Sequence, residues 1–281
     1  METVDIASKI ISVPVPNDGI MEEETNAYII HSPAEGGPAV VVDPGSAAGT
    51  KTILAALARL GNPPVRDILL THAHVDHAAG AAALREATGA PIWLHPDDLP
   101  VAERLKEPLP VDHYLADGQT VEVAGLVFDA VLTPGHAAGH IVFVERTTGV
   151  TLAGDLVHGR GTVGIFPPFG SMRAYLASLQ RLLDRGVTRL LPGHGPVIED
   201  GPATLRRYIE HRLAREEEIA RHLAAGVTTI PDLVARIYPD LAPRNVFAAR
   251  ATVYAHLEKL IEDGRVVQEG ADEQATYRLV R

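Results

Sequence analysis

The chain has 281 residues, 46% of them hydrophobic, enough for one large domain or for a medium domain with a small appendage. It contains no cysteine, which excludes disulfides, thiolate nucleophiles and zinc–thiolate sites, so any metal must be held by nitrogen and oxygen ligands. The formal net charge is −11, and the residues from 201 onward carry 12 basic and 12 acidic side chains, so all the excess negative charge lies in the first 200 residues and disfavours a long polyanion there.

The first 198 residues alternate short β-type runs with helical stretches and Gly/Pro turns. The first half of this region predicts strands in AYIIHS, AVVVDPGS, DILLTH and PIWLH, with helices near 49–60 and 78–88. The second half predicts strands in TVEVAG, LVFDAVLTPG, HIVFVE, GVTLAGD and TRLLPGHG, with a helix near 171–185. Because whole hairpins separate the long helices, two mixed α/β sheets covered by helices fit this order better than one parallel sheet.

The turn GPAT at 201–204 opens a segment of different character. It predicts helices near 203–224, 229–237 and 246–263, followed by a hairpin formed by RVVQEG and ATYRLV. Three helices and a hairpin form a small winged-helix-like domain, so we predict a catalytic domain over 1–200 and a C-terminal domain over 201–281. We expect the apolar residues of its first helix to pack against the first domain or against a second subunit of a homodimer: Leu205, Ile209, Leu213, Ile219 and Leu223.

The N-terminal sequence METVDIASKIISVPVPNDGI has no uninterrupted apolar run of signal-peptide length, so we expect a cytoplasmic protein. No apolar stretch approaches the roughly 20 residues that span a bilayer. We therefore expect no membrane partner.

The segment ILLTHAHVDHAAG carries four ligand-type side chains within six residues, directly after a β-type run and before a helical one. Alternation along an extended chain directs His72 and His74 to the same side. The turn into the helix then brings Asp76 and His77 around a second nearby point. This spacing predicts two adjacent metal sites.

Each zinc ion needs at least three protein ligands, so further ligands must come from elsewhere in the chain. His136 in TPGHAAGH, Asp155 in TLAGD and His194 in LLPGHG each follow an apolar run and a glycine, as expected where a strand ends in a tight loop. Each is a weak signal alone. Together with the first motif they indicate a binuclear site.

The order of HxHxDH, Pro-Gly-His, Gly-Asp and Pro-Gly-His-Gly resembles the metallo-β-lactamase superfamily over about the first 198 residues. The resemblance implies a four-layer αββα sandwich with the metals at one edge of the sheets. It also implies that His72, His74 and His136 hold the first metal, and that Asp155 bridges both ions. The second metal would be held by Asp76, His77 and His194.

True β-lactamases of the di-zinc class commonly use a cysteine where Asp155 falls, and this chain has none. An aspartate there resembles glyoxalase II thioesterases, lactonases and ribonucleases of the superfamily instead. The segment YIEHRLAREEEI and the residues after it resemble the tail of β-lactamase-like hydrolases with a winged-helix domain, a group that includes an endoribonuclease.

Five other residues are candidates for supporting roles. Asp43, in AVVVDPGS, matches a superfamily position that supports the metal site through hydrogen bonds to its ligands. We interpret His140 as a packed structural histidine that could orient its loop, and His158 as an ordinary surface residue rather than one that reaches the substrate. Asn26 and Tyr28 match a strand near the site and favour a scaffold role.

Two divalent ions, zinc or alternatively iron or manganese, can share a water molecule and fix it as a bridging hydroxide beside a Lewis acid. We expect Asp155 to set the spacing of the ions and Asp76 to accept a hydrogen bond from the hydroxide. No obvious general acid stands out, and a thiolate leaves without one. The chemistry therefore favours a small-molecule thioester, ester or lactone.

The sequence is also compatible with two alternative functions. A single-strand endoribonuclease is supported by the resemblance of the tail but disfavoured by the charge, and a non-catalytic metal-dependent binding module is disfavoured by an intact ligand set. The substrate itself is not readable, because we expect loops such as PVPNDGIMEEE and HGRGTVGIFPPFGS to shape the pocket.

Overall fold

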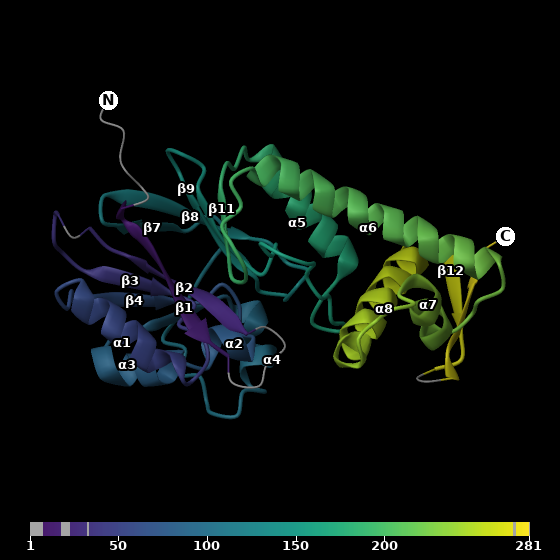
Figure 1. The fold of residues 1–281 in the computed structure, drawn as a ribbon, viewed down its shortest axis with the longest axis horizontal. Helices are drawn as coiled ribbons and strands as arrows, with labels where there is room; N and C mark the ends of the chain where they lie inside the picture. Colours follow the sequence, from purple (N-terminus) through teal and green to yellow (C-terminus); the bar gives the residue numbers. More distant parts are fainter. Residues whose placement is uncertain (1–7, 18–22, 33, 272–273, 281) are drawn as a thin grey trace. The chain divides into compact units, whose positions relative to one another are not determined.

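The structure is a computed structural model that describes residues 8–17, 23–32, 34–271 and 274–280. The chain divides into two compact units. The first comprises residues 1–133, 139–162 and 186–202, and the second comprises 134–138, 163–185 and 203–281. Figure 1 shows the elements of both units along the sequence.

The first sheet of the first unit has six strands in chain order: β1 (Ile10–Pro16), β2 (Glu24–Ile30), β3 (Ala39–Val42), β4 (Val65–Leu69), β5 (Ile92–Leu94) and β6 (His113–Tyr114). The β1–β2 and β2–β3 pairs are antiparallel, whereas β3 to β6 run parallel. The mixed sheet confirms the sequence prediction. Residues 14–16, which the sequence placed in a loop, belong to strand β1. Prolines are tolerated there because β1 is an edge strand. Residues 18–22 of the expected loop lie outside the described residues.

The second sheet of the first unit has the order β11-β10-β9-β8-β7. Its strands are β7 (Thr120–Val123), β8 (Leu126–Leu132), β9 (Ile141–Glu145), β10 (Thr151–Gly154) and β11 (Leu190–Pro192). β7, β8, β9 and β10 form antiparallel neighbours, and β10 pairs with β11 in parallel. The carboxyl ends of β10 and β11 therefore lie at the same edge of this sheet.

Four short or medium helices belong to the first unit: α1 (Gly49–Arg59), α2 (Val75–Ala78), α3 (Ala81–Thr88) and α4 (Leu99–Ala102), the last preceded by the 3-10 turn η2 (Pro96–Asp98). The helix expected near 78–88 is interrupted before Ala81. Gly80 donates its N–H to the carbonyl of Gly45 at 2.8 Å, and a Cβ on Gly80 would lie 2.7 Å from the carbonyl oxygen of Ser46. This close passage of two backbones separates α2 from α3.

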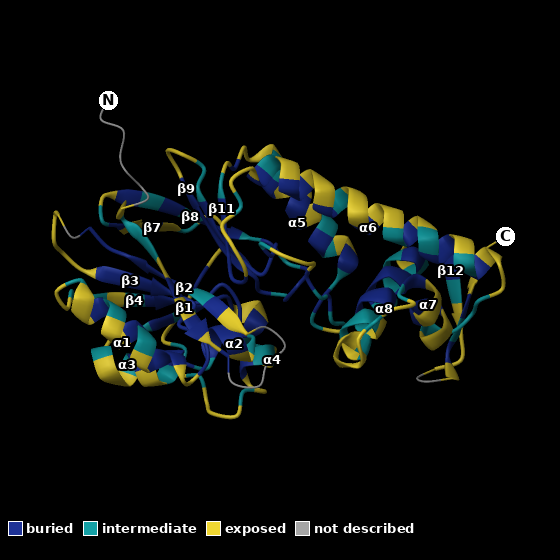
Figure 2. Cartoon of the chain, viewed as in Figure 1, coloured by how far each residue is buried: buried dark blue, intermediate teal, exposed yellow. Residues whose placement is uncertain are grey.

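The core of the first unit lies on the two faces of the first sheet. On one face, Ile29 and Val41 pack with Ile53 of α1 and Leu84 of α3. On the other face, the side chains of Tyr28, Val40 and Val42 pack with the second sheet, for example with Phe128 and Phe143. Figure 2 shows both sheets as largely buried ribbons with exposed residues on the outer sides of α1 and α3. The first unit thus stacks helices, sheet and sheet in successive layers.

The second unit contains the remaining helices and a hairpin: α5 (Met172–Asp184), α6 (Gly201–Ala224), α7 (Ile230–Ile237), the 3-10 turn η3 (Pro243–Asn245), α8 (Val246–Glu262), β12 (Val266–Glu269) and β13 (Thr276–Leu279). Ser171 and Thr229 begin α5 and α7 by accepting backbone N–H groups of the first turn. α6 already begins at Gly201, where the sequence suggested a turn. The prediction of a domain boundary at residue 200 stays a prediction.

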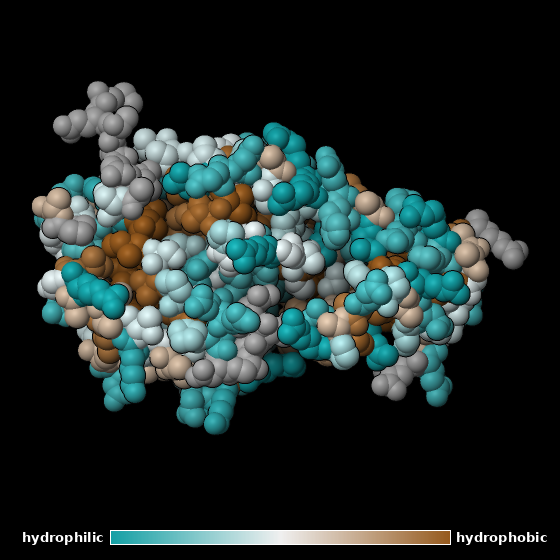
Figure 3. Space-filling view, viewed as in Figure 1, coloured by the Kyte–Doolittle hydropathy of each residue, from teal (hydrophilic) through white to brown (hydrophobic). Residues whose placement is uncertain are grey.

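The winged-helix part of the second unit has its own core. Leu233 of α7, Leu257 of α8 and Tyr277 of β13 are buried together with Ile219 of α6. Figure 3 shows mostly hydrophilic side chains along α6 on the face in view, as expected for a helix with one apolar side. Among the helices of the described residues, none is both long enough and apolar enough to cross a membrane.

His256 of α8, to which the sequence assigned no role, is fully buried, and neither of its ring nitrogens has a hydrogen-bond partner among the described residues. Burial, aided by the charge of Arg212, lowers its pKa to about 3. Between pH 6.5 and about pH 3, His256 is therefore protonated in the unfolded chain but neutral in the folded chain. We expect the free energy of unfolding to fall by about 1.4 kcal/mol per pH unit in this window.

His256→Leu should reduce this loss of stability between pH 6.5 and pH 5. Urea unfolding at pH 6.5 and pH 5 measures the change in the free energy of unfolding. His222→Gln is the control, because His222 lies on α6 and is only partly buried. An equal pH dependence in wild type and His256→Leu would contradict the assignment.

Candidate metal centre

Six of the seven predicted ligands lie in the first unit, at the carboxyl ends of its strands. His72 and His74 follow β4, and Asp76 and His77 lie in α2 directly after them. Asp155 and His194 follow the parallel neighbours β10 and β11. These are the positions at which open α/β sheets place ligands. The seventh, His136, lies in residues 134–138, which belong to the second unit.

Asp155 stands between two buried histidines. Its Oδ1 lies 3.3 Å from Nε2 of His77, and its Oδ2 lies 3.5 Å from Nε2 of His194. Nε2 of His194 is also 3.1 Å from Oδ2 of Asp76. Asp76, His77 and His194 form one group able to hold a cation, with one ligand atom from each residue within 4.8 Å of the others. The structure thus brings together four of the residues that the sequence singled out.

The hydrogen bonds of His77 and His194 determine which ring nitrogen carries the proton. Nδ1 of His77 donates to Oδ2 of Asp43 at 2.9 Å, and Nδ1 of His194 donates to the carbonyl of Glu24 at 2.7 Å. Both Nε2 atoms therefore carry lone pairs in the neutral rings, and they lie 3.2 Å apart. Two facing lone pairs repel unless a proton or a metal ion lies between them. Nitrogen ligands about 2.0–2.1 Å from a tetrahedral ion are about 3.3–3.4 Å apart, so this spacing fits a metal ion.

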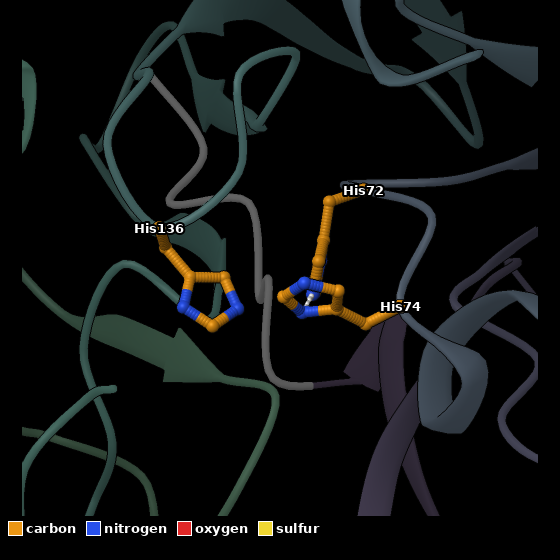
Figure 4. Close-up of side chains that lie close together, drawn as sticks. All are labelled: His72, His74 and His136. Atoms are coloured by element: carbon orange, nitrogen blue, oxygen red, sulfur yellow. Dashed lines mark hydrogen bonds between the residues drawn. The ribbon is translucent and has the colours of Figure 1, made fainter. Parts of the chain in front are cut away.

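His72 and His74 form a second pair of ring nitrogens. Nε2 of His72 lies 3.0 Å from Nδ1 of His74, and Figure 4 draws both side chains together with His136. His136 donates its Nδ1 proton to the carbonyl of Gly164 at 2.9 Å, which leaves its Nε2 with a lone pair. Each of these rings can therefore offer a nitrogen to a divalent ion.

Asp43 connects the two histidine groups, which supports the role that the sequence suggested for it. Its carboxylate accepts the backbone N–H of Thr71 at 2.7 Å and the Thr71 hydroxyl at 2.6 Å, in addition to His77. The Thr71 oxygen in turn accepts Nδ1 of His72 at 3.0 Å. Thr71 was missed by sequence reasoning, although its place directly before the HxHxDH motif is a signal. Such partners orient metal ligands and fix their tautomers.

Asp98 holds the backbone of two loops that carry histidines. It is fully buried, and it accepts the N–H of Ala73 at 2.6 Å and the N–H of Gly139 at 3.0 Å. Ala73 lies between the first two histidines of the motif, and Gly139 directly precedes His140. Burial raises the pKa of Asp98. Sequence reasoning missed Asp98, because a Pro-Asp-Asp run after a strand is an ordinary turn.

His140 positions the backbone of Asp155. Its Nε2 accepts the N–H of Asp155 at 3.1 Å, while its Nδ1 donates to the Thr133 hydroxyl at 2.9 Å. Complete burial lowers the pKa of His140 to about 3 and keeps it neutral, as the accepting nitrogen requires. His140 is therefore a packed histidine that also orients the loop of Asp155.

The loop that carries His194 is held by the strand β2. Asn26 donates its side-chain N–H groups to the carbonyls of Pro192 at 3.0 Å and Gly195 at 2.8 Å. The Tyr28 hydroxyl also donates to Pro192, at 2.8 Å. Both residues have the scaffold role that the sequence suggested.

His158 is buried rather than on the surface. Its Nε2 lies 3.3 Å from Oδ2 of Asp155, and its ring centroid is 5.0 Å from that of His194. Asp155, His158 and His194 form a further group able to hold a cation. The turn after β10 brings His158 back toward Asp155, which a short sequence segment does not reveal.

The electrostatics of the cluster favour positive charge. Burial alone would raise the pKa of Asp155, but the neighbouring His194 and His77 hold it well below its usual range. Burial also lowers the pKa of His194, yet Asp155 and Asp76 overcome this and raise it to about 10. The carboxylates thus draw cations to this point, and divalent ions compete there with protons.

Comparisons with known proteins decide the family. The sequence model of the Metallo-beta-lactamase superfamily matches residues 21–194, which is more than half of the chain. The chain belongs to this superfamily. The model of the Beta-lactamase associated winged helix domain matches residues 229–274. The fold is therefore the metallo-β-lactamase fold with a C-terminal winged-helix domain, as the sequence predicted.

Relatives in the superfamily include a Beta-lactamase-like protein 2 homolog of Caenorhabditis elegans, 32% identical over 86% of this chain and 80% of its own length. A Hydroxyacylglutathione hydrolase of Jannaschia sp. is 31% identical over 97% of this chain and 96% of its own. An Atrochrysone carboxyl ACP thioesterase of Aspergillus fumigatus is 30% identical over 77% of this chain and 65% of its own.

Solved structures agree with the family. A metallo-beta-lactamase family protein of Thermus thermophilus has a TM-score of 0.80 at 27% identity, covering 97% of this chain and 99% of its own. A protein solved in a di-iron-bound form has a TM-score of 0.55 at 35% identity, covering 68% of this chain and 96% of its own. The superfamily, its named hydrolases and the His/Asp clusters make this chain a metal-dependent hydrolase that uses divalent metals.

Proposed function

We propose that the chain is a binuclear hydrolase that cleaves a small-molecule thioester, ester or lactone. The observation that supports this proposal most strongly is the buried group around Asp155. Nε2 of His77 and Nε2 of His194 lie 3.2 Å apart in this group, while the Nδ1 protons of the two rings are donated to Asp43 and to the carbonyl of Glu24. In this proposal Asp155 would be a ligand shared by two ions. The remaining ligands would be His72, His74 and His136 for the first ion and Asp76, His77 and His194 for the second.

The chain's own residues would orient the reaction. When bound, the two ions supply positive charge that lowers the pKa of a water molecule and polarises the substrate carbonyl. Oδ2 of Asp76 lies 3.1 Å from Nε2 of His194 and 3.9 Å from Nε2 of His77, where it could accept a hydrogen bond from the attacking water. Asp43 and the carbonyl of Glu24 keep the ligand histidines in the tautomer that offers Nε2.

The leaving group favours thioesters within this class. Among the described residues, the largest charges that act on the pKa of Asp155, His77 and His194 come from aspartates and histidines. An alkoxide or amine leaving group benefits from a proton donor, whereas a thiolate leaves without one. Relatives named as a carboxyl ACP thioesterase and as a hydroxyacylglutathione hydrolase support this choice.

RNA cleavage is the second candidate, and it rests on the winged-helix domain alone. One basic residue of α8 is already paired with carboxylates. Lys259 is engaged by Glu216 at 2.9 Å and by Asp263 at 2.7 Å. The net charge of −11 also opposes the approach of a polyanion.

We propose zinc as the metal, with iron or manganese as alternatives, because nitrogen and oxygen ligands suit all three. Elemental analysis of the purified protein should find close to two ions per chain, since the proposed ligands and the bridge satisfy two ions. Metal-free protein that gains no activity with any of these ions would contradict the binuclear proposal.

With the metal-loaded protein, kcat/KM on an acyl thioester panel should exceed that on short single-stranded RNA by more than about tenfold. The measurement uses thioesters, lactones and RNA in one buffer over a salt series. RNA cleavage that weakens steeply with salt, alongside negligible turnover of esters and thioesters, would reverse the ranking of the two functions.

A further inference from the structure

Residues 163–165 of the second unit are held from three sides. The carbonyl of Gly164 accepts the Nδ1 proton of His136 at 2.9 Å. On one side of it, the carbonyl of Val163 accepts a guanidinium N–H of Arg212 from α6. On the other side, the N–H of Ile165 donates to the hydroxyl of Thr252 from α8 at 3.4 Å. Both helices belong to the C-terminal part of the chain.

Arg212 is an unusual residue for a protein interior. It is only 2% exposed, and its guanidinium lies 5.3 Å from the ring centroid of Tyr175. Among the described residues its Nε has no hydrogen-bond partner, and no carboxylate pairs with it. The nearest buried carboxylate along α6, Glu216, is already paired with Lys259 and Arg265. A buried cation without a counter-ion is costly, so the bond to Val163 is its main compensation.

The backbone of the loop that carries His136 is held by helix α5. Ser171, at the start of α5, donates its N–H to the carbonyl of Gly135 at 2.8 Å. The Ser178 hydroxyl donates to the carbonyl of Pro134 at 2.7 Å. A Cβ on Gly135 would lie 2.3 Å from the backbone of Tyr175, so the loop is packed tightly on α5. The ring of His136 can still rotate about its two side-chain bonds, and the hydrogen bond to the carbonyl of Gly164 restrains this rotation.

We infer that Arg212 is a positioning residue for His136. By holding the carbonyl of Val163, it fixes the next peptide group, whose Gly164 carbonyl sets the orientation and tautomer of the His136 ring. Thr252 does the same from the other side, with a longer and weaker hydrogen bond. The C-terminal helices thus act on the ring of His136 through one backbone segment of the same unit. The inference rests on the proposed role of His136 as a metal ligand.

The test compares Arg212→Met with Arg215→Met in the full-length protein. Arg215 is a matched control because it lies on the same helix, packs over the ring of Tyr238 at 4.6 Å and pairs with Glu218, but does not contact residues 163–165. Chelator competition measures zinc affinity, and the His136 Nδ1–H proton resonance of the metal-free protein reports the hydrogen bond to Gly164.

We expect Arg212→Met to weaken binding of one of the two zinc ions about 10- to 100-fold and to abolish or broaden the His136 Nδ1–H resonance. Arg215→Met should change neither. Arg212→Lys, which keeps a charged donor, should restore part of both. Valine has nearly the same shape as threonine but lacks the hydroxyl, so Thr252→Val should change the zinc affinity and the His136 resonance in the same direction by a smaller factor.

An unchanged resonance and unchanged zinc affinity in Arg212→Met would overturn the inference, as would equal losses in Arg215→Met. If Arg212→Met does not fold, Arg212→Lys and Thr252→Val decide, and wild-type values in both would overturn it. Failure of the proposed function is distinguishable, because a wild-type chain that binds no zinc would still show the His136 resonance and its dependence on Arg212.

Discussion

Replacing Asp155 with alanine should lower the zinc content of the purified protein and reduce kcat/KM by more than about 100-fold. Loss of a residue that only supports a ligand typically costs 10- to 100-fold, and Asp155 is placed as a ligand itself. Its two oxygens lie 3.3 Å from Nε2 of His77 and 3.5 Å from Nε2 of His194. The negative charge of Asp155 is the main cause of the raised pKa of His77 and of His194, and the substitution removes this charge.

The measurement combines elemental analysis, steady-state kinetics on a thioester and circular dichroism of the metal-free protein. Asp240→Asn is the control, because Asp240 is an exposed aspartate of the second unit. We expect the fold of Asp155→Ala to persist, since the cores of both units lie elsewhere. Normal turnover in Asp155→Ala would remove the basis of the assigned centre.

Asp98→Asn should destabilise the metal-free protein by about 1–3 kcal/mol and weaken zinc binding about 10- to 100-fold. The carboxylate accepts one backbone N–H on each oxygen, from Ala73 and from Gly139. An asparagine can accept only one of them, and its own NH₂ group would then face the other N–H. The strand-end loops of the ligand motif and of His140 would lose their common anchor.

Asp97→Asn is the matched control for this experiment, because Asp97 is the adjacent residue and its side chain is 62% exposed. Urea unfolding of the metal-free proteins and zinc competition of the loaded ones separate the two effects. A normal zinc affinity in a destabilised Asp98→Asn protein would show that the anchor serves the fold but not the metal ligands.

The amino-acid sequence by itself determined the ligand-type residues and most of the elements that carry them. The spacing of His72, His74, Asp76 and His77 is local, because a strand end followed by a helix turn directs these side chains to one region. Asp155 could be predicted for a similar reason, since the apolar run and glycine before it mark a strand end. The helices of the tail were readable because their apolar residues recur with helical spacing.

Only the tertiary structure decided which residues hold these ligands in place. Asp98 and Arg212 have no distinctive neighbours in sequence, and each holds a backbone group that lies in another loop. Asp98 is 25 residues from Ala73 and 41 from Gly139, and Arg212 is 49 from Val163. Any aspartate or arginine can accept or donate such a bond, so chemistry alone does not select it. Chain folding selects it, by bringing one particular side chain to the backbone group that needs a partner.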